Sequence, residues 1–88
     1  NELLTIKGVK ASFVVYRGEG EICVSARSYG YFDVSAIMEQ LGGGGNTTMA
    51  AAQLPGASIY KTVRKLERVI RAYAENRREE TGEDKASN

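Results

Sequence analysis

A run of four glycines, Gly42–Gly45, is the sharpest local feature of the sequence. Glycines that lead into the N-terminus of a helix let backbone N–H groups approach an anion without interference from a Cβ atom, and the helix dipole favours the negative charge. A flexible linker is the alternative, but a helix is predicted directly before the run and capping residues begin at Asn46. No lysine follows directly, so the run is not a P-loop. We therefore treat it as a candidate phosphate cradle.

Arg27 is the second candidate binding group, because it ends a predicted strand on the same face as Ser25 and directly precedes Ser28. A guanidinium can bind a phosphate through two parallel hydrogen bonds, with neighbouring hydroxyls as further donors. The alternative is a solvated surface arginine. Packing over the predicted hairpin is favoured over stacking on a base for the aromatic residues that follow, Tyr29, Tyr31 and Phe32.

The composition excludes several kinds of catalytic centre. Histidine is absent and Cys23 is the only cysteine, which excludes an intrachain disulfide, a Cys/His zinc site and a histidine general base. We assign Cys23 to the core as a small filler. The only aspartates are Asp33, a predicted helix cap, and Asp84, in the predicted tail, so a two-metal phosphoesterase centre lacks ligands. No catalytic residue and no metal ligand is assigned in this chain.

The length of 88 residues allows one small domain. Its 12 Lys and Arg residues nearly balance 11 Asp and Glu residues, and the net charge of +1 does not by itself indicate a nucleic-acid or membrane partner. No apolar run approaches the roughly 20 residues of a membrane span. Because Asn1 stands in the middle of a pattern, we expect the chain to be part of a longer protein.

Two segments with alternating apolar residues predict the strands that position Arg27. Val9–Tyr16 and Glu21–Arg27 each place apolar side chains on one face, and the short polar connection between them is typical of an antiparallel hairpin. Downstream, Asp33 is a good N-cap for a helix whose apolar stripe ends at Leu41, directly before the glycine run.

Two helices are predicted after the glycine run, with Gln53 and Leu54 between them left open as a short strand. Capping residues at 46–48 indicate a short helix at Met49–Ala52, and Ser58 caps a last helix. That helix has an apolar stripe for the core, Ile59, Val63, Leu66, Ile70 and Tyr73. Its opposite side carries a basic stripe, Lys61, Arg64, Lys65, Arg68 and Arg71.

These elements predict an α/β fold of the α+β kind. It consists of a small mixed sheet with an N-terminal antiparallel hairpin, packed by two main helices and by the short helix after the glycine-rich loop. Residues 1–7 are interpreted as the end of an incoming helix. Residues 1–80 are expected to form one domain, and residues 81–88 a disordered tail.

Three segments, taken together and in this order, carry a family resemblance: Val24–Ser28, Ile37–Gly45 and Met49–Leu54. They resemble the C-terminal DHH-associated (DHHA) domain of DHH-family phosphoesterases, with the nearest similarity to the bacterial cyclic-di-AMP phosphodiesterases of that family. The resemblance runs from about Glu2 to Ala74, which is most of the chain.

The resemblance implies a substrate-binding role. In such proteins a preceding DHH catalytic domain binds two manganese ions, and the DHHA domain closes over the cleft and grips the nucleotide. The arginine of the family's SxRS motif and its glycine-rich loop bind substrate. These elements correspond here to Arg27 and to Gly42, Gly43, Gly44 and Gly45, with Ser25 and Ser28 in support. No cofactor is expected in this chain itself, and manganese is expected in the DHH domain.

Asn46 departs from the family pattern, because the family loop usually reads GGGH or GGGGH and Asn46 occupies the histidine position. An amide can donate a hydrogen bond to phosphate but cannot carry a positive charge near pH 7. Either the binding of phosphate is weaker, or the parent protein has reduced activity or an altered substrate. Asn46 stays among the candidate substrate-binding residues.

Two functions are therefore compared. The first is a substrate-binding domain of a manganese-dependent phosphodiesterase acting on cyclic di-AMP or short oligonucleotides. The alternative is a non-catalytic module that docks or binds single-stranded nucleic acid through the basic stripe of the last helix. The expected partners are the nucleotide and the DHH domain, with a homodimer left open and no direct membrane contact. The expected location is the cytoplasm, with a parent protein that the resemblance allows to be membrane-anchored.

Overall fold

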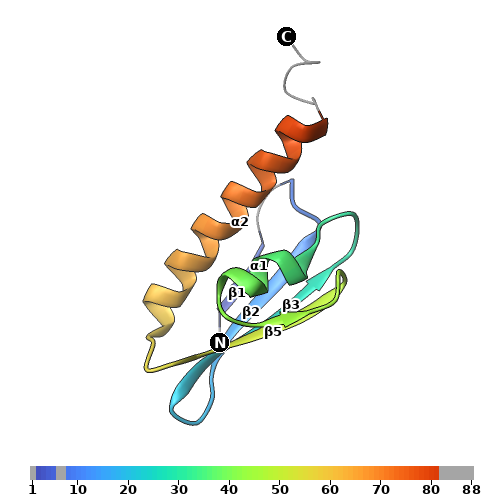
Figure 1. Cartoon of the computed structure of the whole chain (residues 1–88). Coiled ribbons are helices and arrows are strands. Elements are labelled where there is room, and N and C mark those ends of the chain that lie inside the picture. The colour runs from blue at the N-terminus through green and yellow to red at the C-terminus, as the bar shows by residue number, and fades with distance from the viewer. Residues whose placement is uncertain (1, 6–7, 82–88) are drawn as a thin grey trace.

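The computed structural model describes residues 2–5 and 8–81, which form a five-stranded sheet with two helices packed on one of its faces (Figure 1). In chain order the elements are β1 (Glu2–Leu4), β2 (Ala11–Arg17), β3 (Glu21–Ser28), α1 (Val34–Gln40), β4 (Gly44–Gly45), β5 (Met49–Pro55) and α2 (Ile59–Thr81). The strand order is β1-β2-β3-β5-β4. The predicted α+β class is confirmed.

The β2–β3 hairpin is the centre of the sheet, as the alternating pattern predicts. Its register pairs Phe13 with Ala26 and Val15 with Val24, so the apolar side chains of both strands lie on one face. That face is buried: Phe13 and Val15 are fully inaccessible and Val24 is 1% exposed. The polar side chains of the same strands are thereby placed on the opposite, open face.

The two helices cover the apolar face of the sheet and begin at the predicted caps. The Asp33 carboxylate accepts a hydrogen bond from the Ser35 amide (2.9 Å) at the start of α1, and the Ser58 hydroxyl accepts one from the Lys61 amide (3.1 Å) at the start of α2. The apolar stripes of both helices, with the aromatic ring of Phe32, complete the core. Among the described residues, no helix is long and apolar enough to cross a membrane.

Three predictions about secondary structure are wrong. Met49–Ala52 is not a short helix but the first half of β5, which pairs with β3 on one side and β4 on the other. Alanine favours helix locally, but pairing on both edges and the burial of Ala52 (3% exposed) stabilise the strand. The sheet is not mixed, because all pairings of the described strands are antiparallel. Residues 2–4 form β1, not the end of a helix.

The remaining boundary predictions fall partly outside the described residues. The N-terminal prediction over 1–7 includes residues 1, 6 and 7, and the predicted tail over 81–88 includes residues 82–88, none of which the structure describes. Within the described range, α2 extends through Thr81.

The glycine run ends α1 and then enters the sheet. Gly42, at φ 87°, donates to the Glu39 carbonyl (3.1 Å), and Gly43 donates to the Met38 carbonyl (2.8 Å), which is the hydrogen-bond pattern of a Schellman C-cap. A Cβ atom on Gly43 would collide with the Ala51 carbonyl oxygen and lie 2.6 Å from the Ala52 Cα atom. The loop therefore approaches β5 more closely than any side chain would allow.

Gly44 differs from its neighbours in the run. A Cβ atom at this position would meet nothing within 4 Å, and its φ is not positive. On Gly45, by contrast, a Cβ atom would lie 2.5 Å from the Ala50 Cα atom. Nothing in the packing of the described residues requires glycine at position 44.

We predict opposite stability effects for two neighbouring substitutions. Gly43→Ala should lower the free energy of unfolding by about 1–3 kcal/mol, because β5 or the loop must move to make room for the added methyl group. Gly44→Ala should leave it unchanged or raise it by about 0.5–1 kcal/mol, because alanine loses less backbone entropy on folding. Urea unfolding of the two variants measures both values, and equal destabilisation by both would contradict this packing.

Cys23 is buried, at 8% exposure, but lies outside the main core cluster. It is on the open face of β3, where its thiol donates to the Glu21 carboxylate at 3.7 Å. Burial, and then the negative charge of Glu21, raise the pKa of the Cys23 thiol, while a hydrogen bond with Tyr16 opposes the shift. Cys23 is thus buried as a small side chain, as the sequence predicts, but it lies outside the main core cluster.

The raised pKa predicts slow alkylation of Cys23 and a pH-dependent stability. At pH 8.5 the folded chain should react with iodoacetamide more slowly than the urea-unfolded chain, and Glu21→Gln should react faster than wild type because one cause of the shift is gone. Since the folded state holds the thiol proton more tightly, wild type should lose stability relative to Cys23→Ala as the pH rises above about 8.5. Equal alkylation rates for folded wild type and Glu21→Gln would contradict the conclusion that Glu21 raises the pKa of Cys23.

Candidate functional site

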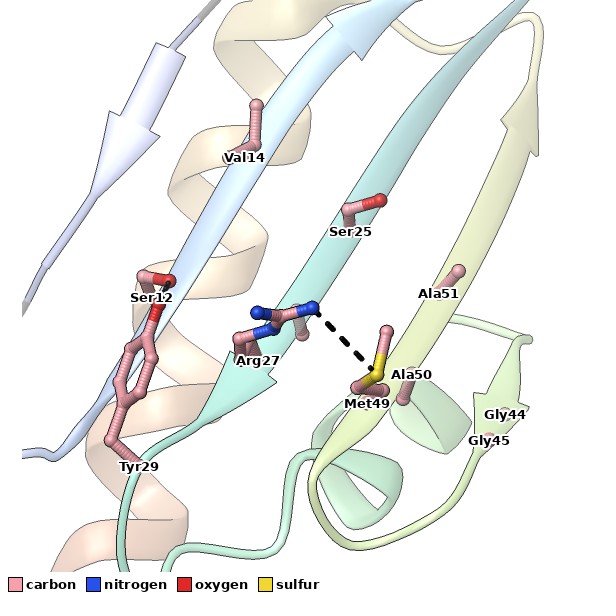
Figure 2. A pocket seen from close by; sticks show the side chains of 11 residues that line it. Ser12, Val14, Ser25, Arg27, Tyr29, Gly44, Gly45, Met49, Ala50 and Ala51 are labelled. Carbon is pink, nitrogen blue, oxygen red and sulfur yellow. Dashed lines mark hydrogen bonds between the residues drawn. The ribbon is translucent and has the colours of Figure 1, made fainter.

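A pocket of about 570 Å³ lies on the open face of the sheet, over β2, β3, β5 and β4 (Figure 2). Its floor consists of small side chains that the strand register places next to one another. Ser25 of β3 is opposite Val14 of β2 and Ala51 of β5, and Ala51 is in turn opposite Gly44 of β4. Ser25, Ala51 and Gly44 have small side chains or none, so this part of the sheet face leaves room for a ligand.

Arg27 stands at one end of this floor, in a second row across the sheet. It is opposite Ser12 on β2 and Met49 on β5. The guanidinium is exposed, and among residues 2–5 and 8–81 its side-chain partner is the Met49 sulfur, with 3.8 Å between Nη2 and Sδ. A thioether is a weak acceptor, and a guanidinium has five N–H donors. Arg27 therefore places a positive charge, with donors to spare, beside a pocket of small residues.

The two serines beside Arg27 have different places. Ser25 is exposed and contributes to the pocket floor. Ser28 is on the buried face, at 7% exposure, where its hydroxyl donates to the Gly30 carbonyl (3.3 Å) and accepts from the Gly30 amide (3.4 Å). Ser28 does not line the pocket. It holds the turn that follows β3.

The glycine run contributes two of its four residues to the pocket. Gly44 and Gly45 line it, whereas Gly42 and Gly43 end α1 and contact β5. The prediction that the glycine run leads into the N-terminus of a helix is wrong, because the strand β5 follows the run. The loop therefore does not lead into the positive end of a helix dipole. β4 is instead an edge strand, and an edge strand presents backbone groups that the sheet does not pair.

Asn46 is exposed and forms the tight turn between β4 and β5, outside the pocket lining. Its side-chain oxygen accepts hydrogen bonds from the Met49 amide (2.8 Å), the Thr48 amide (3.0 Å) and the Thr48 hydroxyl (3.0 Å). This is the capping interaction that the sequence predicts, but it holds a hairpin turn where a helix start was predicted. Only the Nδ2 group of Asn46 is left to donate to a ligand.

The structure thus gathers Ser25, Arg27, Gly44 and Gly45 around one pocket, and the other predicted residues, Ser28, Gly42, Gly43 and Asn46, do not line it. Sequence reasoning did not include Ser12 and Met49, which flank Arg27. Ser12 lies on the polar face of the first alternating segment, which is a signal for exposure to the same surface as Arg27. Met49 was missed because a helix was predicted at Met49–Ala52, and a helix would not place Met49 opposite Arg27 in the sheet.

The basic stripe of α2 lies away from the pocket, because α2 packs against the opposite face of the sheet (Figure 2). The five basic side chains of the stripe are exposed. One of them, Arg64, donates to the Tyr60 hydroxyl at 2.9 Å and lies 5.7 Å from the centre of that ring.

Within the part of the chain that the structure describes, no three His, Cys, Asp or Glu residues come together in a way that could hold a metal ion. The described residues therefore offer no donor set for a manganese pair, and the resemblance places that pair in the DHH domain. We derive no metal-dependent step from the residues of this chain.

The sequence matches the model of the DHHA1 domain family over residues 1–75. It is 49% identical over 74 residues to the cyclic-di-AMP phosphodiesterase GdpP of Geobacillus thermodenitrificans, a match that covers 83% of this chain and 11% of that protein. GdpP of Bacillus subtilis is 45% identical over 76 residues (85% and 12%). PdeA of Listeria monocytogenes, also a cyclic-di-AMP phosphodiesterase, is 44% identical over 72 residues (81% and 11%).

The chain spans about a tenth of the length of these curated relatives. The match to the family model nevertheless covers most of the chain and includes every strand of the sheet. The resemblance carried by Val24–Ser28, Ile37–Gly45 and Met49–Leu54 is confirmed: this chain belongs to the DHHA1 domain family.

Proposed function

We propose that residues 1–80 form the substrate-binding domain of a phosphodiesterase that acts on cyclic di-AMP or a short oligonucleotide. The observation that supports this most is the exposed Arg27 guanidinium, without a carboxylate partner among the described residues, beside a pocket with a floor of small side chains. The names of three relatives, all cyclic-di-AMP phosphodiesterases, support the substrate class.

In this proposal Arg27 binds a phosphate of the nucleotide with its unused N–H donors. The fork of a guanidinium matches two phosphate oxygens, and the charge makes those hydrogen bonds stronger than neutral ones. The exposed hydroxyl of Ser25 adds a donor from the floor, and the glycine edge at Gly44 lets a ligand approach the backbone. The domain would thus fix the position of the phosphate, and orientation alone can supply a large part of a rate enhancement.

The chemical step belongs, in the same proposal, to a DHH domain that works with this one. Manganese bound in that domain would supply the activated water. The residues of this chain bind and orient the nucleotide and keep it in the cleft. We further propose a cytoplasmic location, because nucleotide substrates and a lone buried thiol such as Cys23 fit a reducing compartment.

Arg27→Ala should weaken the binding of cyclic di-AMP to this chain by about 10- to 150-fold, the range for losing hydrogen bonds to a charged group. The fold should survive, since the side chain is exposed. Arg27→Lys should recover only part of the affinity, because an ammonium cannot form the two parallel bonds. Titration calorimetry or NMR titration measures these affinities.

Arg68→Ala is the matched control for Arg27→Ala. It removes the same charge from an exposed position of α2, on the other side of the molecule. It should leave the affinity for cyclic di-AMP within about twofold of wild type. A loss of affinity in Arg68→Ala with none in Arg27→Ala would contradict the proposal and favour nucleic-acid binding by the basic stripe.

Gly44→Ala should weaken binding while the chain stays as stable as wild type. The added methyl group meets no atom of the protein within 4 Å, so only a ligand in the pocket can collide with it. The expected loss is about 5-fold or more, and comparison of the binding titration with the urea unfolding curve separates the two effects. Unchanged affinity would mean that the ligand does not approach the backbone at Gly44.

A further inference from the structure

Tyr29 is an aromatic residue at the rim of the pocket. The proposed binding of phosphate by Arg27 does not involve this side chain. It is 67% exposed, and its hydroxyl lies 3.3 Å from the Ser12 hydroxyl in a hydrogen bond. Figure 2 shows the ring beside Ser12, on the same face of the sheet as Arg27. Tyr29 therefore contacts the hairpin through its hydroxyl, as the sequence-based expectation allows, while most of its side chain remains exposed.

The backbone of Tyr29 is hydrogen-bonded, as is its hydroxyl. The Tyr29 amide donates to the Lys10 carbonyl (2.8 Å), and the amide of the preceding residue, Ser28, donates to the Thr48 carbonyl (2.8 Å). The Ser28 hydroxyl bonds the amide and the carbonyl of Gly30 on the other side. An exposed ring that is fixed at both ends loses little conformational entropy when a ligand covers it.

The position of the Tyr29 ring relative to Arg27 indicates which chemical class of ligand could contact both side chains. Ser12, which bonds the Tyr29 hydroxyl, is the residue of β2 directly opposite Arg27. A charged group that attracts an anion therefore lies next to an exposed aromatic surface. A nucleotide joins the two complementary features, since it carries a phosphate and a flat base.

We propose that the ring of Tyr29 is the stacking platform for a nucleobase of the ligand whose phosphate Arg27 binds. The inference rests on the proposed function and adds the residue that favours a nucleotide over a bare phosphate ester. Stacking of one base on an aromatic side chain corresponds to about 5- to 150-fold in affinity. It tolerates any base, because every base has a π-face.

Other exposed aromatic residues fit this role less well. Tyr60 lies on α2, and its ring and hydroxyl already contact Arg64. Tyr31 is 92% exposed but does not line the pocket. Tyr29 is the aromatic residue among the described residues that lines the pocket.

Two ligands that differ only in the base test the inference on this chain. AMP and ribose 5-phosphate carry the same phosphate and sugar, so the ratio of their affinities, measured by NMR titration, reports the contribution of the base. Wild type should bind AMP about 5- to 150-fold more tightly than ribose 5-phosphate. Tyr29→Leu should reduce the affinity for AMP to that for ribose 5-phosphate and leave the latter unchanged.

Three further variants separate stacking from a general structural effect. Tyr29→Phe keeps the ring and should keep most of the preference for AMP. Tyr31→Leu, the matched control, should keep all of it. Arg27→Ala should weaken both ligands by the same factor.

The outcomes distinguish this inference from the proposed function. Equal binding of AMP and ribose 5-phosphate by wild type, or an equal loss of both in Tyr29→Leu, overturns the platform and leaves the phosphate site of Arg27 standing. Binding of both ligands that Arg27→Ala does not weaken overturns the proposed function, and with it this inference.

Discussion

The burial of one face of the β2–β3 hairpin is the constraint on which the rest of the structure depends. Side chains of a strand alternate between two faces, so burying Val24 and Ala26 beneath the helices obliges Ser25 and Arg27 to point the other way. A shift of one residue in register would bury the Arg27 guanidinium, at a cost far above any gain from repacking. The packing of the core thus fixes the position of the candidate binding group.

A second constraint is the use of small residues where backbone meets backbone. Gly43 and Gly45 allow the loop after α1 to lie directly against β5, and Ala51 and Gly44 keep the floor of the pocket low. These glycines were expected to bind a ligand because backbone N–H groups can approach an anion where there is no Cβ atom. Two of them are required by packing and one, Gly42, by the end of a helix. Nothing in the packing of the described residues requires glycine at position 44.

The sequence predicted the elements whose signals are local. The alternation in Glu21–Arg27 and the caps Asp33 and Ser58 identified a strand and two helix starts, because each signal lies within a few residues of the element it describes. The helix predicted at Met49–Ala52 failed for the converse reason: the alanines favour helix locally, while the strand pairings that decide the outcome come from distant segments. The pocket itself depends on cross-strand register, which no local pattern contains. The faces of Ser25 and Ser28, by contrast, follow from local alternation, because two residues three positions apart in one strand lie on opposite faces.

The central claim is that the open face of the sheet binds the nucleotide. The most direct measurement is the mapping of backbone amide shifts in the ¹⁵N-labelled chain as cyclic di-AMP is added. The structure predicts that the largest changes occur at Ser25–Arg27, at Gly44–Gly45 and at Met49, with little change along α2. Changes concentrated at Lys61–Arg71, with none around Arg27, would contradict the claim.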